Sequence, residues 1–268
     1  MEDLPRGLAS SNAPRIAGKL GSISAGKVLD VGTADEDFID VLIKTLKAYD
    51  SFVGIDYCAS DRSRTAMESA QERCGGKPVQ FLRMNAGKLG FDDESFDTVC
   101  ISHSLHHLAD TGRVMAEMKR VLKAGGRFML QEMYCDGEQT DAQKTDALQH
   151  EWSARIDSLL GITHNKPLRR REIVSIVRHL KLRETEIIDS THLIDCLFCE
   201  RRHECEDPRN QAILHDSMKG IDEEIERIRD HPDVQARTRL MEDAEQIRQA
   251  IAEFGASPPS YLFAIGVK

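Results

Sequence analysis

The chain has 268 residues, and its 36 Lys and Arg against 45 Asp and Glu give a net charge of −9. Hydrophobic residues make up 40% and charged residues 30%, which is typical of a globular protein and excludes a disordered one. The acidic balance argues against a nucleic-acid groove spread over the molecule, because phosphate contacts need clustered Lys and Arg. We therefore expect a globular protein with no nucleic-acid partner.

The sequence contains no uninterrupted apolar run of the roughly 20 residues that a membrane span needs, and its first residues lack the apolar core of a secretion signal. We accordingly expect a cytoplasmic protein with no membrane partner. The seven cysteines are then expected to be reduced thiols.

Short apolar runs rich in β-branched residues alternate with helical spacing over the first half of the chain. Together with two later runs they predict seven strands, at residues 27–32, 51–56, 79–84, 98–102, 127–132, 184–188 and 261–267. Such alternation predicts the α/β fold class: a Rossmann-like seven-stranded, mostly parallel sheet with helices on both faces and ligands at the carboxyl ends of its strands.

The second half of the sequence is mainly helical in its apolar spacing. Residues 1–134 are expected to form the core, residues 135–182 a helical lid over the substrate, and residues 183–190 and 260–268 the final core strands. The intervening residues 191–259 are too many for an ordinary connection, which predicts an insertion with structure of its own.

Two stretches of this insertion, residues 214–228 and 240–254, repeat apolar residues in steps of four and three. The pair Asp207-Pro208 is expected to start the first helix, and Pro232 to end it, which predicts an antiparallel helical hairpin. Its apolar stripe either packs on its own domain, or seals a homodimer or caps the substrate.

The first predicted strand runs through Asp30 into a turn at Gly32 and then into a helix, so that backbone can approach a nucleotide-like ligand. Acids at positions 35–37 crowd this turn and would repel the pyrophosphate of a dinucleotide. S-adenosylmethionine carries a net positive charge and fits the turn better. Asp56 ends the second strand, roughly 20 residues after Gly32, where a carboxylate can accept both hydroxyls of a ribose.

Four segments, taken in order, resemble the class I S-adenosylmethionine-dependent methyltransferases with a type 11 methyltransferase domain. The resemblance covers about residues 27–132 and rests on Val28-Leu-Asp-Val-Gly32, Gly54-Ile-Asp56, residues 85–97 and the Arg120-Val-Leu-Lys-Ala-Gly-Gly126 run. The chain departs from the family in its glycine-rich turn, where Ala34 and Glu36 replace two glycines, and at Asn85, which replaces an Asp.

The resemblance implies a methyltransferase that uses S-adenosylmethionine and acts on a small-molecule acceptor. It also implies a set of cofactor-binding residues. These are Asp30, Gly32, Thr33 and Ala34 at the methionine end, Asp56 at the ribose, Tyr57 beside the adenine, Asn85 and Ala86 at the adenine edge, and Ser102 near the methionine or the substrate.

His103, His106 and His107 follow the fourth strand at its carboxyl end, where the transferred methyl is expected. A hydroxyl acceptor needs a base to remove its proton, and His suits neutral pH, so these are candidate catalytic residues. His103 is the better candidate to face the pocket. The alternative is that the adjacent pair is a packing feature with one ring hydrogen-bonded inside.

Cys196, Cys199, His203 and Cys205 are ligand types of a tetrahedral zinc site, and they open the insertion. Structural zinc is one interpretation, with His192 as an alternative fourth ligand. An iron–sulfur or redox role and unligated thiols, one of them handling a soft substrate, are the others.

Two further functions stay open beside the small-molecule methyltransferase. One is a protein methyltransferase, whose acceptor is a side chain of a partner. The other is a non-catalytic module that binds S-adenosylmethionine for assembly or sensing.

Overall fold

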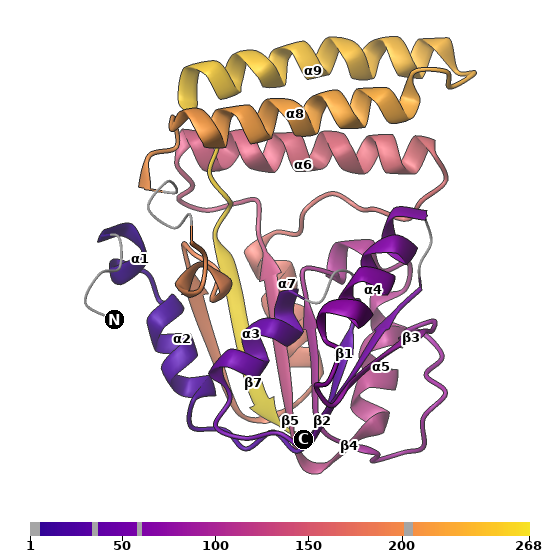
Figure 1. Ribbon diagram of the computed structural model, residues 1–268, viewed down its shortest axis with the longest axis vertical. Helices are drawn as coiled ribbons and strands as arrows, with labels where there is room; N and C mark the ends of the chain where they lie inside the picture. The colour runs from indigo at the N-terminus through magenta and orange to yellow at the C-terminus, as the bar shows by residue number, and fades with distance from the viewer. Residues whose placement is uncertain (1–5, 34–36, 58–60, 201–205) are drawn as a thin grey trace.

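A computed structural model describes the chain except residues 1–5, 34–36, 58–60 and 201–205 (Figure 1). Its centre is a seven-stranded sheet in the order β3-β2-β1-β4-β5-β7-β6. The strands are β1 Lys27–Val31, β2 Ser51–Asp56, β3 Val79–Arg83, β4 Phe96–Ser102, β5 Leu122–Met133, β6 Arg183–Ser190 and β7 Tyr261–Val267. β1 to β5 pair in parallel, and β7 pairs antiparallel with both β5 and β6. The predicted mostly parallel α/β sheet is therefore confirmed.

The strand β1 lies in the middle of the parallel part, between β2 and β4. Its side chains Val28, Leu29 and Val31 are fully buried. A parallel strand covered on both faces needs such a continuous apolar run, which is why the run was visible in the sequence.

Helices cover both faces of the sheet, and each face has its own apolar core. On one face, α2 (Ala13–Leu20) and α3 (Asp37–Thr45) contribute Ile16, Leu20, Ile39 and Leu42. On the other, α5 (Thr111–Val121) and α7 (Arg170–His179) contribute Met118, Val121, Ile173 and Val177. The short α1 (Arg6–Ser10) precedes α2, and α4 (Asp61–Arg73) packs on β3.

The strand β5 begins earlier than predicted, at Leu122, directly after α5. Leu122 pairs with Phe96, and pairing then resumes between Arg127 and Thr98, so the residues between form an irregularity. Gly125 adopts φ +77° there, a conformation that suits glycine. The two glycines therefore interrupt a strand instead of preceding it.

Three long helices form a separate layer above the sheet: α6 (Asp141–Leu159), α8 (Gln211–Ile228) and α9 (Val234–Phe254) (Figure 1). They share a third apolar core. Its buried residues are Trp152, Ile156, Ile221, Ile228, Leu240, Ala244, Ile247 and Ile251. The stripe of the α8–α9 hairpin thus packs on α6 of its own chain, the first of the alternatives considered above.

The helix α8 does not start at Asp207-Pro208 as predicted. It starts at Gln211, and the Asn210 side chain caps it by accepting a hydrogen bond from the Ala212 N–H at 2.9 Å. The Asp207 side chain instead accepts a hydrogen bond from the Arg209 N–H, and this bond stabilises a turn that precedes the helix. Asn is as good a helix cap as Asp, so the sequence offered two adjacent starts.

The layer α6–α8–α9 lies across the end of the sheet at which the parallel strands finish (Figure 1). Two short 3₁₀ turns, η1 (Leu105–His107) and η2 (Asp195–Leu197), follow β4 and β6. Among the described residues, no helix is long and apolar enough to cross a membrane. The division into core, lid and insertion stays a prediction.

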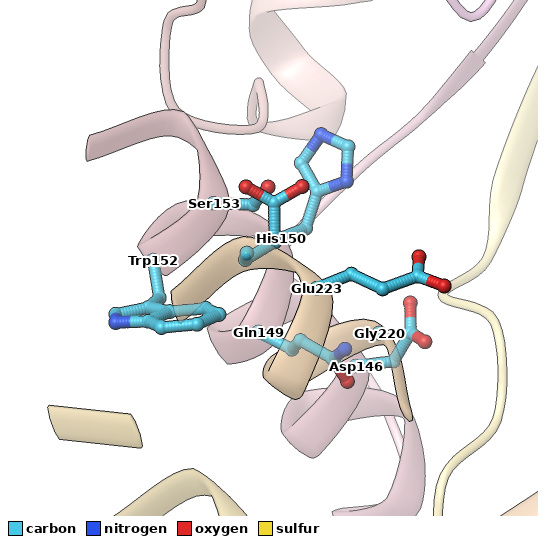
Figure 2. A pocket seen from close by; sticks show the side chains of 8 residues that line it. Asp146, Gln149, His150, Trp152, Ser153, Gly220 and Glu223 are labelled. Carbon is cyan, nitrogen blue, oxygen red and sulfur yellow. The ribbon is translucent and has the colours of Figure 1, made fainter. Parts of the chain in front are cut away.

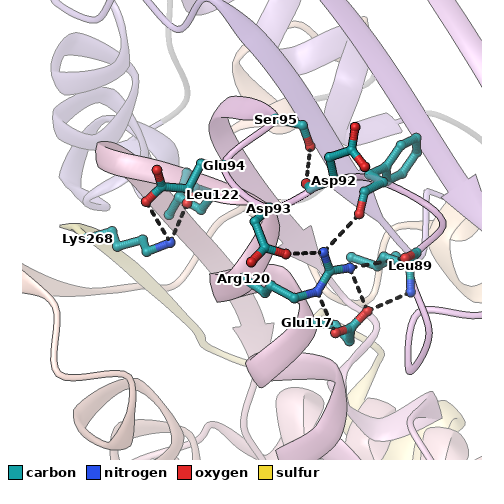
Figure 3. A network of polar contacts seen from close by, with 10 residues as sticks. Leu89, Asp92, Asp93, Glu94, Ser95, Glu117, Arg120, Leu122 and Lys268 are labelled. Carbon is teal, nitrogen blue, oxygen red and sulfur yellow. Dashed lines mark hydrogen bonds and ion pairs between the residues drawn. The ribbon is translucent and has the colours of Figure 1, made fainter.

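A polar network fastens the loop before β4 to α5 (Figure 3). Arg120 donates to the carboxylates of Glu117 and Asp93 and to the carbonyls of Phe91 and Leu89. The hydrogen bonds to Glu117 and Asp93 raise the pKa of Arg120 and outweigh the opposite effect of burial. The run around Arg120 thus fixes the segment that the sequence places at the adenine.

Candidate active site

Predicted cofactor residues from three neighbouring strands meet at the carboxyl edge of the sheet. Val31 of β1 pairs with Ile55 of β2 and with Ile101 of β4, so the residues that follow each strand lie at one edge. The N–H groups of Gly32 and Thr33 both donate to the Ile55 carbonyl, at 2.8 and 3.0 Å. This bonding turns the chain sharply after β1.

Gly32 is required by the shape of this turn. Its φ is +74°, and a Cβ there would lie 2.4 Å from Ser104 Oγ. The Ser104 hydroxyl donates to the Gly32 carbonyl at 2.9 Å, which holds the segment after β4 against the turn after β1. Ala34, the next predicted contact, lies outside the described residues.

Asp30 is 1% exposed and faces into the protein beneath this turn. Burial, with a smaller contribution from the neighbouring Asp56 carboxylate, raises the pKa of Asp30 to about 7. The Cys100 thiol contacts the Asp30 carboxylate at 3.3 Å and opposes this rise. Near neutral pH this carboxyl is therefore poised between its acid and its ionised form.

The residues predicted to hold ribose and adenine follow β2 and β3. Asp56 ends β2 half-buried, and its carbonyl accepts from the Met84 N–H at 2.8 Å. Tyr57 is 59% exposed, so its ring is accessible to a flat ligand. Asn85 lies two residues after the end of β3. Its side-chain oxygen accepts a hydrogen bond from the Gly87 N–H at 2.8 Å and so shapes the loop that includes Ala86. The two strands are paired up to Asp56 and Arg83, so these residues share one edge.

His103 is the first residue after β4. Its φ of +49° is an unusual backbone conformation for a residue other than glycine. Its N–H donates to the Gln131 carbonyl at 2.9 Å, and the Gln131 amide donates to Ser102 Oγ at 3.2 Å. The His103 ring packs edge-on against Tyr261 of β7, with centroids 4.8 Å apart. Non-glycine residues held in this conformation cluster at functional sites.

His106 and His107 lie in η1 and belong to a group of four histidines. His150 of α6 and His164, in the segment after α6, complete it. The ring centroid of His164 lies 4.1 Å from that of His107 and 5.0 Å from that of His150. Distant parts of the sequence thus converge beside the predicted catalytic residues.

A buried carboxylate orients His106. Glu132 is fully buried, and its carboxylate contacts His106 Nδ1 at 3.0 Å and accepts from the N–H groups of Leu105 and Met133. Burial raises the pKa of Glu132, but the charge and hydrogen bond of His106 outweigh burial and hold that pKa below its usual range. The alternative of a hydrogen-bonded internal histidine therefore describes His106 well.

His164 is held in the same way from the helical layer. Its Nδ1 lies 2.7 Å from Asp157 of α6, and Asp157 also pairs with Arg227 of α8. Burial raises the pKa of Asp157, but the His164 hydrogen bond and Arg227 bring it below its usual range. Both His106 and His164 thus have one nitrogen engaged by a carboxylate.

His150 borders a pocket of about 210 Å³ between α6 and α8 (Figure 2). Three acidic side chains are among the residues that line it, and they are Asp146, Glu223 and Glu224. Burial, followed by the charges of His106, His164 and His107, lowers the pKa of His150 to about 3. Burial also raises the pKa of Asp146 to about 7.

Sequence reasoning missed Glu132, His150, Asp157 and His164. Glu132 was visible only as the last residue of a strand, and the other three lie on a helix and a loop without a motif. A signal was present in part, because His150 and Asp157 are seven residues apart and share one face of a helix.

The predicted cysteine site is only partly within the described chain. Cys196 lies in the short turn η2 and is half-buried, and Cys199 is exposed. His203 and Cys205 lie outside the described residues. His192, the alternative ligand, is half-buried, with its ring 3.4 Å from the Cβ that a side chain at Gly7 would have. Zinc at this cluster stays a prediction.

Comparison with known proteins agrees with this geometry. Residues 29–130 match the methyltransferase domain family. Over 112 residues, which are 42% of this chain, the sequence is 32% identical to the ubiquinone/menaquinone biosynthesis C-methyltransferase UbiE of Desulfotalea psychrophila. The match spans 43% of that relative, less than half of its length.

Solved structures share the fold over nearly the whole chain. The [4+2]-cyclase SpnF has a TM-score of 0.56 and 17% identity, and the alignment covers 95% of this chain and 78% of SpnF. Haemonchus contortus phosphoethanolamine N-methyltransferase 2, in complex with S-adenosyl-L-methionine, has a TM-score of 0.53 and 18% identity, covering 96% and 52%.

By its fold the chain is a Rossmann-like α/β protein. Its residues 29–130 match a methyltransferase domain and resemble the class I S-adenosylmethionine-dependent methyltransferases.

Proposed function

We propose that the chain transfers a methyl group from S-adenosylmethionine to a small-molecule acceptor. One observation carries the proposal: Gly32, Asp56 and Asn85 follow adjacent parallel strands and share one edge of the sheet. The family match over residues 29–130 and the methyltransferase relative support it.

Each cofactor residue has a role that its place allows. The turn of Gly32 and Thr33 would receive the methionine end above Asp30, and Ala34, the next residue in the sequence, is assigned to the same end. The Asp56 carboxylate would accept the ribose hydroxyls. Tyr57 and the segment of Asn85 and Ala86 would enclose the adenine, and Ser102 would lie beside the methionine.

Methyl transfer is an in-line displacement at the sulfonium methyl, so the protein mainly has to align the acceptor with that methyl. We assign His103 as the base that would take a proton from the acceptor, because it follows β4 at this edge in a constrained backbone conformation. His106 and His107 pack among other histidines and would act on the site through position rather than as bases.

The acceptor is proposed to be a small molecule because the relative described above is named as a C-methyltransferase of ubiquinone and menaquinone biosynthesis. A protein acceptor and a non-catalytic module are the alternatives. SpnF shares the fold but is named for a cyclisation, so the fold alone does not define the reaction.

The cofactor assignment is tested by calorimetry with S-adenosylmethionine. Asp56→Ala should weaken binding by about 1–3 kcal/mol, since hydrogen bonds to a charged group are lost. Asp50→Ala is the matched control, because the exposed Asp50 lies just before the other end of β2. Equal affinity of the Asp56 variant and the wild type would reject the ribose site.

The acceptor class is tested by methylation of a cell lysate with labelled cofactor, sorted by molecular size. Label in small molecules supports the proposal, and label in polypeptides supports a protein acceptor. A screen with hydroxyl, amine, thiol and carbon acceptors then defines the acceptor atom. Cofactor binding without transfer to any acceptor would favour the non-catalytic module.

A homodimer through the α8–α9 hairpin has weaker support, because α6 covers most of the hairpin's apolar stripe. Three hydrophobic residues of α9, Val234, Met241 and Phe254, stay 58%, 45% and 41% exposed, and these are what a second copy would cover. Light scattering of the purified chain decides this point.

A further inference from the structure

The four-histidine group contains three imidazoles with the geometry of a metal site. One nitrogen of His106, one of His150 and one of His164 all lie within 4.8 Å of one another. They come from η1, from α6 and from the loop after α6, so folding, not sequence proximity, assembles them. His150 Nε2 and His164 Nε2 are 3.1 Å apart.

These distances are close to those of a tetrahedral zinc site. With metal–nitrogen bonds of about 2.0–2.1 Å, ligand nitrogens in a tetrahedron lie about 3.3 Å apart. The His150–His164 pair already has this spacing, and small side-chain rotations would bring His106 within range. Without a metal, one of the two Nε2 atoms must donate to the other, so a simple hydrogen-bonded pair is the competing interpretation.

Carboxylates orient two of the three rings in the way that metal-binding histidines require. Glu132 engages Nδ1 of His106, and Asp157 engages Nδ1 of His164. Each carboxylate fixes the ring and leaves its Nε2 for another partner. Carboxylate–histidine–metal triads of this kind raise the basicity of the ligand and recur at zinc sites.

The surroundings also carry the charge that a cation needs. Glu132 is fully buried, and its hydrogen-bond partners within the described part of the chain are His106 and two backbone N–H groups. The pocket beside His150 is lined by Asp146 and Glu223, so carboxyl groups lie near one of the three rings (Figure 2). Arg227 neutralises part of the charge of Asp157 and Glu224, which leaves Glu132 as the main internal counterion.

We propose that His106, His150 and His164 form a three-histidine site for a divalent transition metal, with Zn²⁺ as the best match to three imidazoles in a tetrahedral arrangement. Three protein ligands leave one position for water or for an oxygen of a bound molecule. His107 is not part of the proposed site, because the nitrogens that lie within 4.8 Å of one another belong to the other three histidines. This site is separate from the cysteine cluster, and it does not depend on the proposed methyl transfer.

The test uses the full chain, stripped of metal by a chelator and then titrated with Zn²⁺ or Co²⁺. One equivalent should bind at the histidine site. X-ray absorption of the zinc-loaded protein should show only nitrogen and oxygen ligands at about 2.0–2.1 Å, because no cysteine takes part. Sulfur neighbours at about 2.3 Å would place the metal at the cysteine cluster instead and overturn the proposal.

Variants separate the two sites. His150→Ala should lower the affinity for Co²⁺ at least tenfold, and Asp157→Asn should lower it about 10–100-fold by releasing His164. His215→Ala is the matched control, because His215 is exposed on α8 outside the group. The double change Cys196→Ser with Cys199→Ser should leave the histidine site unchanged.

The outcome is decided even where a variant folds poorly, since the absorption spectrum comes from the unaltered chain. Failure of the wild type to bind Zn²⁺ or Co²⁺ at micromolar concentration would overturn the site. Equal Co²⁺ affinity of His150→Ala and His215→Ala would do the same. In either case the group would be the hydrogen-bonded cluster of the competing interpretation.

Discussion

The contact between Gly32 and Ser104 joins the turn after β1 to the segment after β4, and it leaves no room for a side chain. Gly32→Ala should destabilise the fold by about 2–4 kcal/mol. Part comes from placing alanine at a positive φ, and part from the clash with Ser104 Oγ. Urea unfolding measures the loss.

A second substitution tells these two costs apart. In the background of Ser104→Gly, the clash is absent and Gly32→Ala should cost only about 1–2 kcal/mol. If the cost of Gly32→Ala were the same in both backgrounds, the Ser104 contact would not be what demands glycine here.

The raised pKa of Asp30 predicts how stability changes with pH. The folded chain keeps the Asp30 proton up to about pH 7, whereas an unfolded Asp loses it near 3.8. Between these values the folded state binds more protons, so the free energy of unfolding falls as pH rises, by at most about 1.4 kcal/mol per pH unit. Asp30→Asn should remove the part of this fall that Asp30 contributes and leave the part that comes from Asp146, whose pKa burial also raises to about 7.

The measurement is urea unfolding at pH 5 and pH 7 for the wild type, Asp30→Asn and the exposed control Asp50→Asn. The control should keep the pH dependence of the wild type. A wild-type slope that persists undiminished in Asp30→Asn would mean that other groups carry it.

At the scale of single residues, the sequence predicted a site residue where the local backbone conformation requires one residue type. Gly32 was predicted because a tight turn demands glycine, and its φ of +74° confirms the turn. The assignment of Asp56 to a ribose stays a prediction. His150 and His164 could not be found, because their meaning depends on a contact with η1 that only tertiary packing creates.

Among the elements, α5 and the loop before β4 depend on one side chain. Arg120 bonds to two carboxylates and two carbonyls at once (Figure 3). Arg120→Ala should therefore destabilise the chain by about 2 kcal/mol, a value kept modest because the network is partly exposed to solvent. Arg120→Lys should recover less than half, because an ammonium lacks the planar fork of guanidinium.

Thermal unfolding checks this, with the exposed Arg171 of α7 changed to Ala as control. Arg171→Ala should have little effect. A loss no larger for Arg120→Ala than for Arg171→Ala would show that the bonds to the loop contribute nothing to stability.

The elements themselves followed from the sequence wherever burial on two faces made a continuous apolar run, as in β1 and β7. Boundaries were wrong where two signals competed. At β5 the glycine pair suggested a stop, but pairing with β4 begins before it. At α8 both Asp207 and Asn210 can cap a helix, and the apolar pattern does not choose between them.

At the scale of the molecule, the helical layer has a core of its own. Trp152 is the one tryptophan of the chain, and it lies in that core with its Nε1 bonded to the Leu240 carbonyl at 2.8 Å. The sheet cores contain no residue of α8 or α9. We expect the layer to open at lower urea concentration than the sheet, since little apolar surface joins them.

Trp152 fluorescence follows the layer, and the reaction of the buried Cys100 thiol between β1 and β4 follows the sheet. The fluorescence transition should come first. Superimposable transitions from the two probes would mean that layer and sheet unfold as a single cooperative unit.

The molecular architecture was predictable as far as the alternation of strands and helices reached. The orientation of the helical layer was not, because the apolar stripes of α6, α8 and α9 fit one another as well as they would fit a partner. Which of these occurs depends on the path of the chain, and no pattern within a single helix encodes it.

The register of the last two strands has a consequence for how such a chain could evolve. Ser190, where β6 ends, sits directly opposite Tyr261, where β7 begins. The described residues between them lie outside the sheet, which the chain leaves and rejoins at neighbouring positions, so ancestral chains could have gained or lost this stretch without shifting a single strand pair. Because Trp152 and Ile156 of α6 are buried beneath it, the unit that recombination could exchange intact includes α6 as well. Related chains could thus share one sheet and differ in the whole helical layer that lies across the carboxyl ends of its parallel strands.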